Sequence, residues 1–221
     1  MDPRPRYSPP QLAAEKKSLI ASERDAWLRA RFAVDQQDVD ANDIVVIDEF
    51  GSNLDMSRRY ARAPRGERAV ASLPRNTPPN TTTISSLTTT GMGPSLMTVG
   101  GVTSKLFEAY IEHILGPTLR PGQIVLLDNL SAHKSARLRK ILAARGCQLW
   151  YLPSYSPDFS PIELAFAKIK AELRRIGART REALEQAVAQ ALKQISPDEA
   201  RAFFIHCGFR LRPDLDQWFC S

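Results

Sequence analysis

Cysteine is scarce in this sequence, and the few that occur are not arranged for bonding to each other. The 221 residues include three cysteines, Cys147, Cys207 and Cys220, with no CxxC pair among them. An odd number of scattered cysteines argues against a disulfide framework. The histidines show neither HExxH nor Cys/His spacing, which excludes the usual zinc sites. This composition predicts a reducing, cytoplasmic compartment.

Long apolar runs are missing as well. No apolar segment approaches the roughly 18 residues of a membrane helix, and the N-terminal MDPRPRYSPP lacks the core of a signal peptide. Hydrophobic residues make up 43% of the chain and charged residues 24%, which is the balance of an ordinary globular protein. The length allows one sizeable domain with a small appendage.

What the sequence does contain is an excess of positive charge. The formal net charge is +6, which suits an anionic partner, most often nucleic acid. The basic residues gather in two segments, the first holding Arg58, Arg59, Arg62, Arg65 and Arg68 and the second holding Lys168, Lys170, Arg174, Arg175, Arg179 and Arg181. Two solvated faces would give the same pattern. Carboxylates close to both segments favour contacts with phosphates, which would be salt-sensitive and independent of base sequence.

Three carboxylates lie next to apolar segments of the sequence: two come directly after an apolar run, and the third lies at the start of an expected helix. Ile-Val-Val-Ile precedes Asp48 and Ile-Val-Leu-Leu precedes Asp128, as in buried strands that each end in an acid. Glu163 follows a proline-rich segment and lies in the first turn of an expected helix. Aligned parallel strands would place both aspartates at one edge of a sheet, where α/β proteins have their sites. Such a cluster of oxygen ligands suits Mg²⁺ and similar hard cations.

Each of these carboxylates also has a simpler explanation. Asp48 could cap a strand end or belong to a Walker B motif, but the GxxxxGK[ST] loop that an ATPase needs is absent. Asp128 could be an Asx-turn residue. Glu163 fits a capping box with Ser160 as the N-cap and Pro161 as the first helical residue. The nearly identical apolar runs before the two aspartates favour metal ligation.

Hydrophobic periodicity predicts an α/β fold. Strands are expected at 44–48, 58–63, 81–89, 95–100, 123–128 and 147–152, and helices at 10–34, 103–115, 134–145, 162–176, 181–195 and from 197 onward. Consecutive strands followed by alternating helices and strands fit a mixed sheet flanked by helices.

The segments around the three carboxylates resemble the catalytic motifs of DDE transposases. VVIDE at Asp48, LLDNLSAHK at Asp128 and YSPDFSPIE at Glu163 occur in the family's order, with 34 residues between the last two acids. The resemblance is to the bacterial insertion-sequence branch of the mariner-like superfamily and covers residues 43 to 208. Ser160 and Phe166 stand where the family usually has Asn and often has Trp.

The resemblance implies an architecture. We expect an RNase H-like fold, with a mixed five-stranded sheet flanked by helices and with further helices at the C-terminal side. The expected divisions are an N-terminal arm or linker helix at 1–40, a catalytic domain at 41–210 and a tail at 211–221. Only about 40 residues precede that domain, too few for the two helix-turn-helix modules of full-length relatives.

The resemblance also implies a function: metal-dependent DNA strand cleavage and strand transfer. Asp48, Asp128 and Glu163 would hold two Mg²⁺ or Mn²⁺ ions. The partners implied are double-stranded DNA, a helix-turn-helix segment or subunit, and further copies of the chain on DNA in the bacterial nucleoid. Contacts with DNA are expected from Asn129, His133, Lys134, Arg65, Lys168 and Lys170.

Two other interpretations stay open. A stand-alone nuclease or resolvase with the same carboxylates would cleave without terminal repeats and give no strand-transfer product. A catalytically silent remnant would bind DNA or partner subunits regardless of metal and regardless of an Asp128→Asn substitution.

Overall fold

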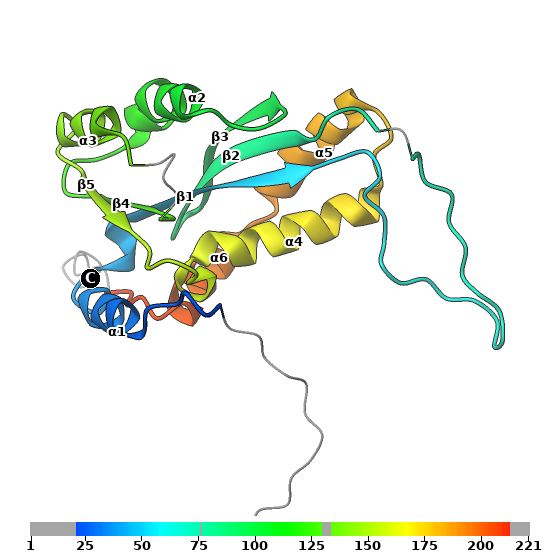
Figure 1. Ribbon diagram of the computed structural model, residues 1–221, viewed down its shortest axis with the longest axis horizontal. Helices are drawn as coiled ribbons and strands as arrows, with labels where there is room; N and C mark the ends of the chain where they lie inside the picture. The colour runs from blue at the N-terminus through cyan, green and yellow to red at the C-terminus, as the bar shows by residue number, and fades with distance from the viewer. Residues whose placement is uncertain (1–20, 76, 130–133, 213–221) are drawn as a thin grey trace, which may run out of the picture.

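The computed structural model describes residues 21–75, 77–129 and 134–212 and is built on one five-stranded sheet (Figure 1). The strands are β1 (Ile44–Ser52), β2 (Thr81–Thr88), β3 (Gly91–Val99), β4 (Ile124–Leu127) and β5 (Gln148–Tyr151). Their order is β3-β2-β1-β4-β5, with β1, β2 and β3 antiparallel and with β4 and β5 parallel to β1. The predicted mixed five-stranded sheet is confirmed.

Helices cover both faces of this sheet (Figure 1). On one face lie α2 (Ser104–Ala109), which continues as a π-helix over Tyr110–Leu115 and a short turn over Gly116–Thr118, and α3 (Ala136–Ala143). On the other face lie α4 (Pro161–Ile176), α5 (Arg181–Lys193) and α6 (Pro197–His206). The remaining helical segments are α1 (Ala26–Asp35) and the short turns Ala41–Asp43 and Pro157–Phe159. None of the described helices has the length and apolar character needed to cross a membrane.

The central strand β1 supplies side chains to two separate cores. Val45 and Ile47 are buried with residues of α2 and α3, whereas Ile44 and Val46 are buried with residues of α4, α5 and α6. This alternation follows from the two-residue period of a strand. Because β1 is buried on both faces, its sequence is continuously apolar up to residue 47.

One predicted strand is wrong. Residues 58–63 form neither strand nor helix, and Arg58 to Ala63 are all exposed. They belong to the long segment between β1 and β2, which projects from the body of the molecule (Figure 1). The segment carries several arginines and few apolar side chains, so a strand there would have no face to bury.

Other boundaries differ from those predicted. The helix expected at 10–34 is confirmed only from Ala26, since residues 21–25 are not helical and residues 1–20 lie outside the described part. Trp27 is 67% exposed and does not share the buried side of Phe32. β1 runs to Ser52 instead of ending at Asp48, and β3 begins at Gly91, so the predicted turn at 90–94 is shorter. Proline is tolerated within β3 because β3 is an edge strand.

Candidate active site

The sheet brings Asp48 and Asp128 side by side. β1 and β4 are parallel neighbours paired at Ile44–Ile124, Val45–Val125 and Val46–Leu126, and the same register places Asp48 level with Asp128. β4 ends at Leu127, so Asp128 follows its carboxyl end, while β1 continues past Asp48. Both aspartates are half-buried. The two aspartates therefore lie level on neighbouring parallel strands as expected, although only Asp128 follows the end of its strand.

Glu163 reaches this edge of the sheet from α4. Buried Ile162 and Phe166 dock the helix, and the ring of Phe166 lies 4.7 Å from that of Phe50 on β1. Glu163 itself is exposed. The alternative explanation of Glu163 as part of a capping box is not supported, because the Ser160 side chain makes no capping hydrogen bond and the Glu163 carboxylate has no hydrogen-bond partner among residues 21–75, 77–129 and 134–212. The carboxylate is thus not engaged by its own helix end.

The three carboxylates line one cavity of about 350 Å³. Its other walls come from the end of β4 and from the segment between β5 and α4. The full lining is Asp48, Asp128, Asn129, Leu152, Pro153, Ser154, Tyr155, Ser156, Pro157, Ser160 and Glu163. Residues that are separate in the sequence therefore meet in one concave site, as the motif order predicted.

The carboxylates also affect one another electrostatically. The pKa of Asp48 is raised from 3.8 to about 7, mainly by burial and further by the charges of Glu163 and Asp128. A hydrogen bond of 2.7 Å, donated by the Glu49 backbone N–H to Asp48 Oδ1, opposes part of this shift. Mutual repulsion of this kind is reduced by a bound cation.

The donor atoms fit a hard divalent cation, since all three side chains offer carboxylate oxygens. Within the described ranges, however, no three His, Cys, Asp or Glu side chains converge closely enough to form a ready ligand set. A cation would have to draw these carboxylates together. The site is therefore a pocket with suitable chemistry that an ion would complete.

Comparison with known proteins identifies the family. A family model described as "DDE superfamily endonuclease" matches residues 43–185, which is more than half of the chain and includes all three carboxylates. The chain belongs to this family. No curated protein sequence matches it.

Solved structures support the same fold. This DDE endonuclease domain superimposes on the Mos1 transposase paired-end complex with left transposon end, with a TM-score of 0.70 and 14% identity over 89% of this chain and 64% of that chain. It also matches the catalytic domain of Mos1 mariner transposase, with a TM-score of 0.54 and 12% identity over 88% of this chain and 100% of that chain. The chain spans a little under two thirds of the Mos1 chain in the complex. The predicted RNase H-like fold is confirmed; membership of the mariner-like superfamily and of its insertion-sequence branch stays a prediction.

In this DDE domain, residues 152–157, between β5 and α4, form much of the pocket wall, and none of them was among the predicted site residues. Asn129 Nδ2 donates a hydrogen bond of 2.9 Å to Ser154 Oγ, which ties this wall to the residue after Asp128. Next to it, Tyr155 has a left-handed φ of 54° and a side chain that is 59% exposed. Such a conformation is uncommon for a bulky residue and often occurs at functional sites. The signal available in the sequence was an exposed aromatic residue inside a proline- and serine-rich segment before Glu163.

Asp158 has a structural partner instead of a place in the pocket. Arg29 Nη1 donates a hydrogen bond of 2.9 Å to its Oδ1, and Arg24 Nη2 lies 3.2 Å from both carboxylate oxygens. The Arg29 guanidinium also lies 4.3 Å from the ring centre of Phe159. These contacts attach α1 to the segment that leads into α4. Burial raises the pKa of Asp158, but the hydrogen bonds and charge of Arg29, with the charge of Arg24, outweigh it and hold that pKa below its usual value.

The residues predicted to contact DNA are distributed around this site. Asn129 lines the pocket, and Lys134 is exposed just before α3. Arg65 is exposed in the projecting segment between β1 and β2. His133 lies outside the described residues. DNA contact by any of them stays a prediction.

The two predicted lysines of α4 face different surroundings. Lys168 Nζ forms an ion pair with Glu199 and donates a hydrogen bond of 3.1 Å to the Gln194 carbonyl, so it already joins α4 to α6. Lys170 instead lines a second pocket, at the far end of β1. DNA contact by Lys168 would require this ion pair to open.

Proposed function

We propose that this chain is the catalytic domain of a transposase, which cleaves DNA strands and joins them to new sites. The observation that carries the proposal is the meeting of Asp48, Asp128 and Glu163 in one pocket of a DDE endonuclease fold. Mos1 transposase complexes with Mg and with Mn support the use of divalent cations. We assign two such ions, Mg²⁺ or Mn²⁺, to these three carboxylates.

In this proposal the main role of the protein is to hold the three carboxylates in fixed positions and to bring the DNA to them. Asp48 and Asp128 are fixed by the sheet, and Glu163 is carried to them on a helix that is docked by buried side chains. When bound, paired divalent ions generate the attacking oxygen and stabilise the leaving oxygen of an in-line displacement. The chemistry needs no covalent bond between protein and DNA, so no serine or tyrosine nucleophile is assigned.

The segment that follows β5 would hold the substrate. Asn129 keeps Ser154 beside the carboxylates, and the exposed ring of Tyr155 lies at the pocket wall. Exposed aromatic rings stack on nucleobases, with a loss of about 1–3 kcal/mol per base when the ring is removed. We therefore assign Tyr155 to contact with DNA bases near the cleaved bond.

Recognition of transposon ends is assigned to other parts of the assembly. We propose that a helix-turn-helix segment or partner subunit reads the terminal repeats, and that copies of this chain assemble on double-stranded DNA at the nucleoid. The basic residues of the described surface would then supply contacts with the phosphate backbone that are independent of base sequence.

The test is metal-dependent cleavage of supercoiled plasmid by the purified chain. Nicking with Mn²⁺ or Mg²⁺ and none in EDTA is expected, with loss of nicking in Asp128→Asn and with normal nicking in the surface control Lys140→Gln. Cleavage that persists in the Asp48, Asp128 and Glu163 variants would contradict the proposal. Joining of a labelled oligonucleotide to the plasmid separates a transposase from a simple nuclease.

A further inference from the structure

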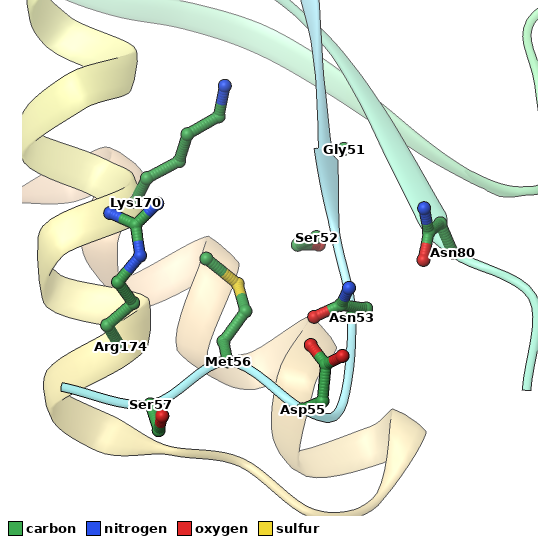
Figure 2. A pocket seen from close by; sticks show the side chains of 9 residues that line it. All are labelled: Gly51, Ser52, Asn53, Asp55, Met56, Ser57, Asn80, Lys170 and Arg174. Carbon is green, nitrogen blue, oxygen red and sulfur yellow. The ribbon is translucent and has the colours of Figure 1, made fainter. Parts of the chain in front are cut away.

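A second pocket lies at the other end of β1, away from the three carboxylates. It has a volume of about 480 Å³, and Figure 2 shows the side chains that line it. Its lining comes from the end of β1, the start of the projecting segment, the residue before β2 and the exposed side of α4. The residues are Gly51, Ser52, Asn53, Asp55, Met56, Ser57, Asn80, Lys170 and Arg174.

The charge of this pocket is positive and unbalanced. Lys170 and Arg174 project from α4, on the side of the pocket across from the end of β1, while Asp55 is the single carboxylate in the lining (Figure 2). Neither cation forms an ion pair with any residue of the described chain, although both are half-buried. By contrast, Lys168 and Arg175 on the same helix pair with glutamates. Two half-buried cations that form no ion pair, with only one carboxylate in the lining, favour an anionic ligand.

The wall of the pocket is held in place. Arg179 Nη1 donates hydrogen bonds of 2.9 Å to the Leu54 carbonyl and 3.0 Å to the Met56 carbonyl, so the start of the projecting segment is attached to the end of α4. Asn53 Oδ1 is buried and has no hydrogen-bond partner among the described residues. A water between this oxygen and a bound anion would donate a hydrogen bond to each.

The pocket is aligned with the candidate active site along α4. Glu163, Lys170 and Arg174 are seven and eleven residues apart, which places them on one side of an α-helix. At 1.5 Å per residue, the backbone positions of Lys170 and Arg174 lie about 10 and 16 Å along the helix from that of Glu163. A DNA strand advances about 3.4 Å per nucleotide, so this offset corresponds to roughly three to five nucleotides.

We propose that this pocket binds a backbone phosphate of DNA, roughly three to five nucleotides from the phosphate that is cleaved. Lys170 and Arg174 would neutralise it, and Asp55 would limit how tightly it is held. The proposal rests on the proposed function, because that function supplies the DNA and the reference point. It assigns a sequence-independent positioning role to the pocket, in line with the usual role of phosphate contacts.

The experiment measures binding of the full chain to a fluorescent duplex in EDTA, so that cleavage plays no part. The variant Lys170→Gln/Arg174→Gln is compared with Arg139→Gln/Lys140→Gln, which removes the same charge from exposed positions on α3, across the sheet. We expect roughly tenfold weaker binding for the pocket variant. Its slope of log affinity against log salt should fall by about one. The α3 variant should change little.

Two further variants separate charge from packing. Lys170→Arg/Arg174→Lys keeps both charges and should retain the salt slope of the original chain. Asp55→Asn removes the opposing charge and should tighten binding. Equal losses in the pocket and α3 variants, unchanged binding in the pocket variant, or a lost slope in the charge-conserving variant would each overturn the proposal.

The same preparations separate this inference from the proposed function. If nicking proves independent of Asp48, Asp128 and Glu163 while the pocket variant still loses affinity selectively, the catalytic assignment fails and the phosphate pocket stands. If plasmid nicking follows the carboxylates but the pocket variant binds normally, the pocket assignment alone fails. If the chain does not bind DNA even at low salt, both fail.

Discussion

Two pockets are built from the same pair of elements and carry opposite charge. β1 and α4 supply Asp48 and Glu163 to the carboxylate pocket, and they supply Ser52 and Lys170 to the basic pocket. In the first, burial and then neighbouring like charges raise the pKa of Asp48; in the second, Lys170 and Arg174 form no ion pair with the described residues. Each pocket has an excess of one charge. The acidic pocket suits divalent cations, and the basic pocket suits a phosphate of the DNA.

The comparison teaches how one helix can serve two tasks. The buried side of α4 is occupied by packing, which leaves a polar side whose first turn carries an acid and whose later turns carry bases. Because the sheet fixes α4, the distance between the two pockets is fixed as well. Predictions can therefore address either pocket while the other serves as an internal reference.

The largest expected effect is on cleavage. Asp48→Asn, Asp128→Asn and Glu163→Gln should each reduce metal-dependent nicking by about a thousandfold or more, because groups that act as one unit cannot replace each other. Binding of duplex DNA in EDTA should not weaken, since the basic pocket is unchanged. Loss of both activities together would indicate misfolding and would remove the distinction between the two pockets.

The next effect is on stability and pH. The folded state raises the pKa of Asp48 from 3.8 to about 7, so folding binds a proton and stability falls as pH rises through this range. Above pH 7 the folded protein carries a charge at this position that is unfavourable, and Asp48→Asn removes it. We expect a melting temperature in EDTA at pH 8 that is higher by about 2–4 °C, for a change of ~1 kcal/mol.

Two controls test this explanation: the melting temperatures are measured again at lower pH, and again with Mn²⁺ at pH 8. The difference between the variant and the original chain should shrink as pH falls from 8 through the folded pKa of about 7, and should vanish only below the unfolded pKa of 3.8, where both states hold the Asp48 proton. Adding Mn²⁺ at pH 8 should raise the melting temperature of the original chain and not that of Asp48→Asn. A similar rise in both would place the metal elsewhere.

A smaller effect concerns the attachment of α1 to the segment before α4. Arg29→Ala removes the ion pair with Asp158 and the contact with the Phe159 ring, and should destabilise the protein by about 1 kcal/mol. The pKa of Asp158 is held low, so this stabilisation is present above the unfolded pKa and is lost as pH falls through the folded value. The difference in unfolding free energy between the two proteins, measured in urea, should therefore narrow as pH is lowered from 7 to 3. If the difference does not change with pH, Arg29 stabilises the protein through packing and not through its ion pair with Asp158.

The sheet and the three carboxylates could be predicted from the sequence because each is marked by a pattern within one short segment. The apolar runs before Asp48 and Asp128 have to be buried on both faces of a sheet, and the stripe that includes Ile162 and Phe166 has to dock on it. The strand predicted at 58–63 was wrong because this exposed, arginine-rich stretch has no apolar face to bury against the sheet.

What the sequence could not reveal are contacts between distant segments. Arg29 and Asp158 are 129 residues apart, and neither shows in its local context that it has a partner. The basic pocket likewise exists only because the end of β1 lies beside α4. Lys170 was predicted to contact DNA from charge alone, but its distinction from Lys168 depends on the presence of Glu199 nearby. Pairing of charges is a property of the fold and has no signature in one segment.

The smallest effect tests whether Glu163 is free for the carboxylate pocket. Both Ser160 and Ser196 precede Pro-x-Glu, and both predict a capping box. In α6 the box forms, with the Ser196 hydroxyl accepting from the Glu199 N–H and with Glu199 reaching back to Ser196; in α4 the Ser160 side chain makes no such bond. Ser196→Ala should therefore cost about 1 kcal/mol and Ser160→Ala less than about half of that, measured by urea unfolding. If the two losses are equal, Glu163 caps its own helix in solution, and the acidic pocket loses one of the three groups that distinguish it from the basic one.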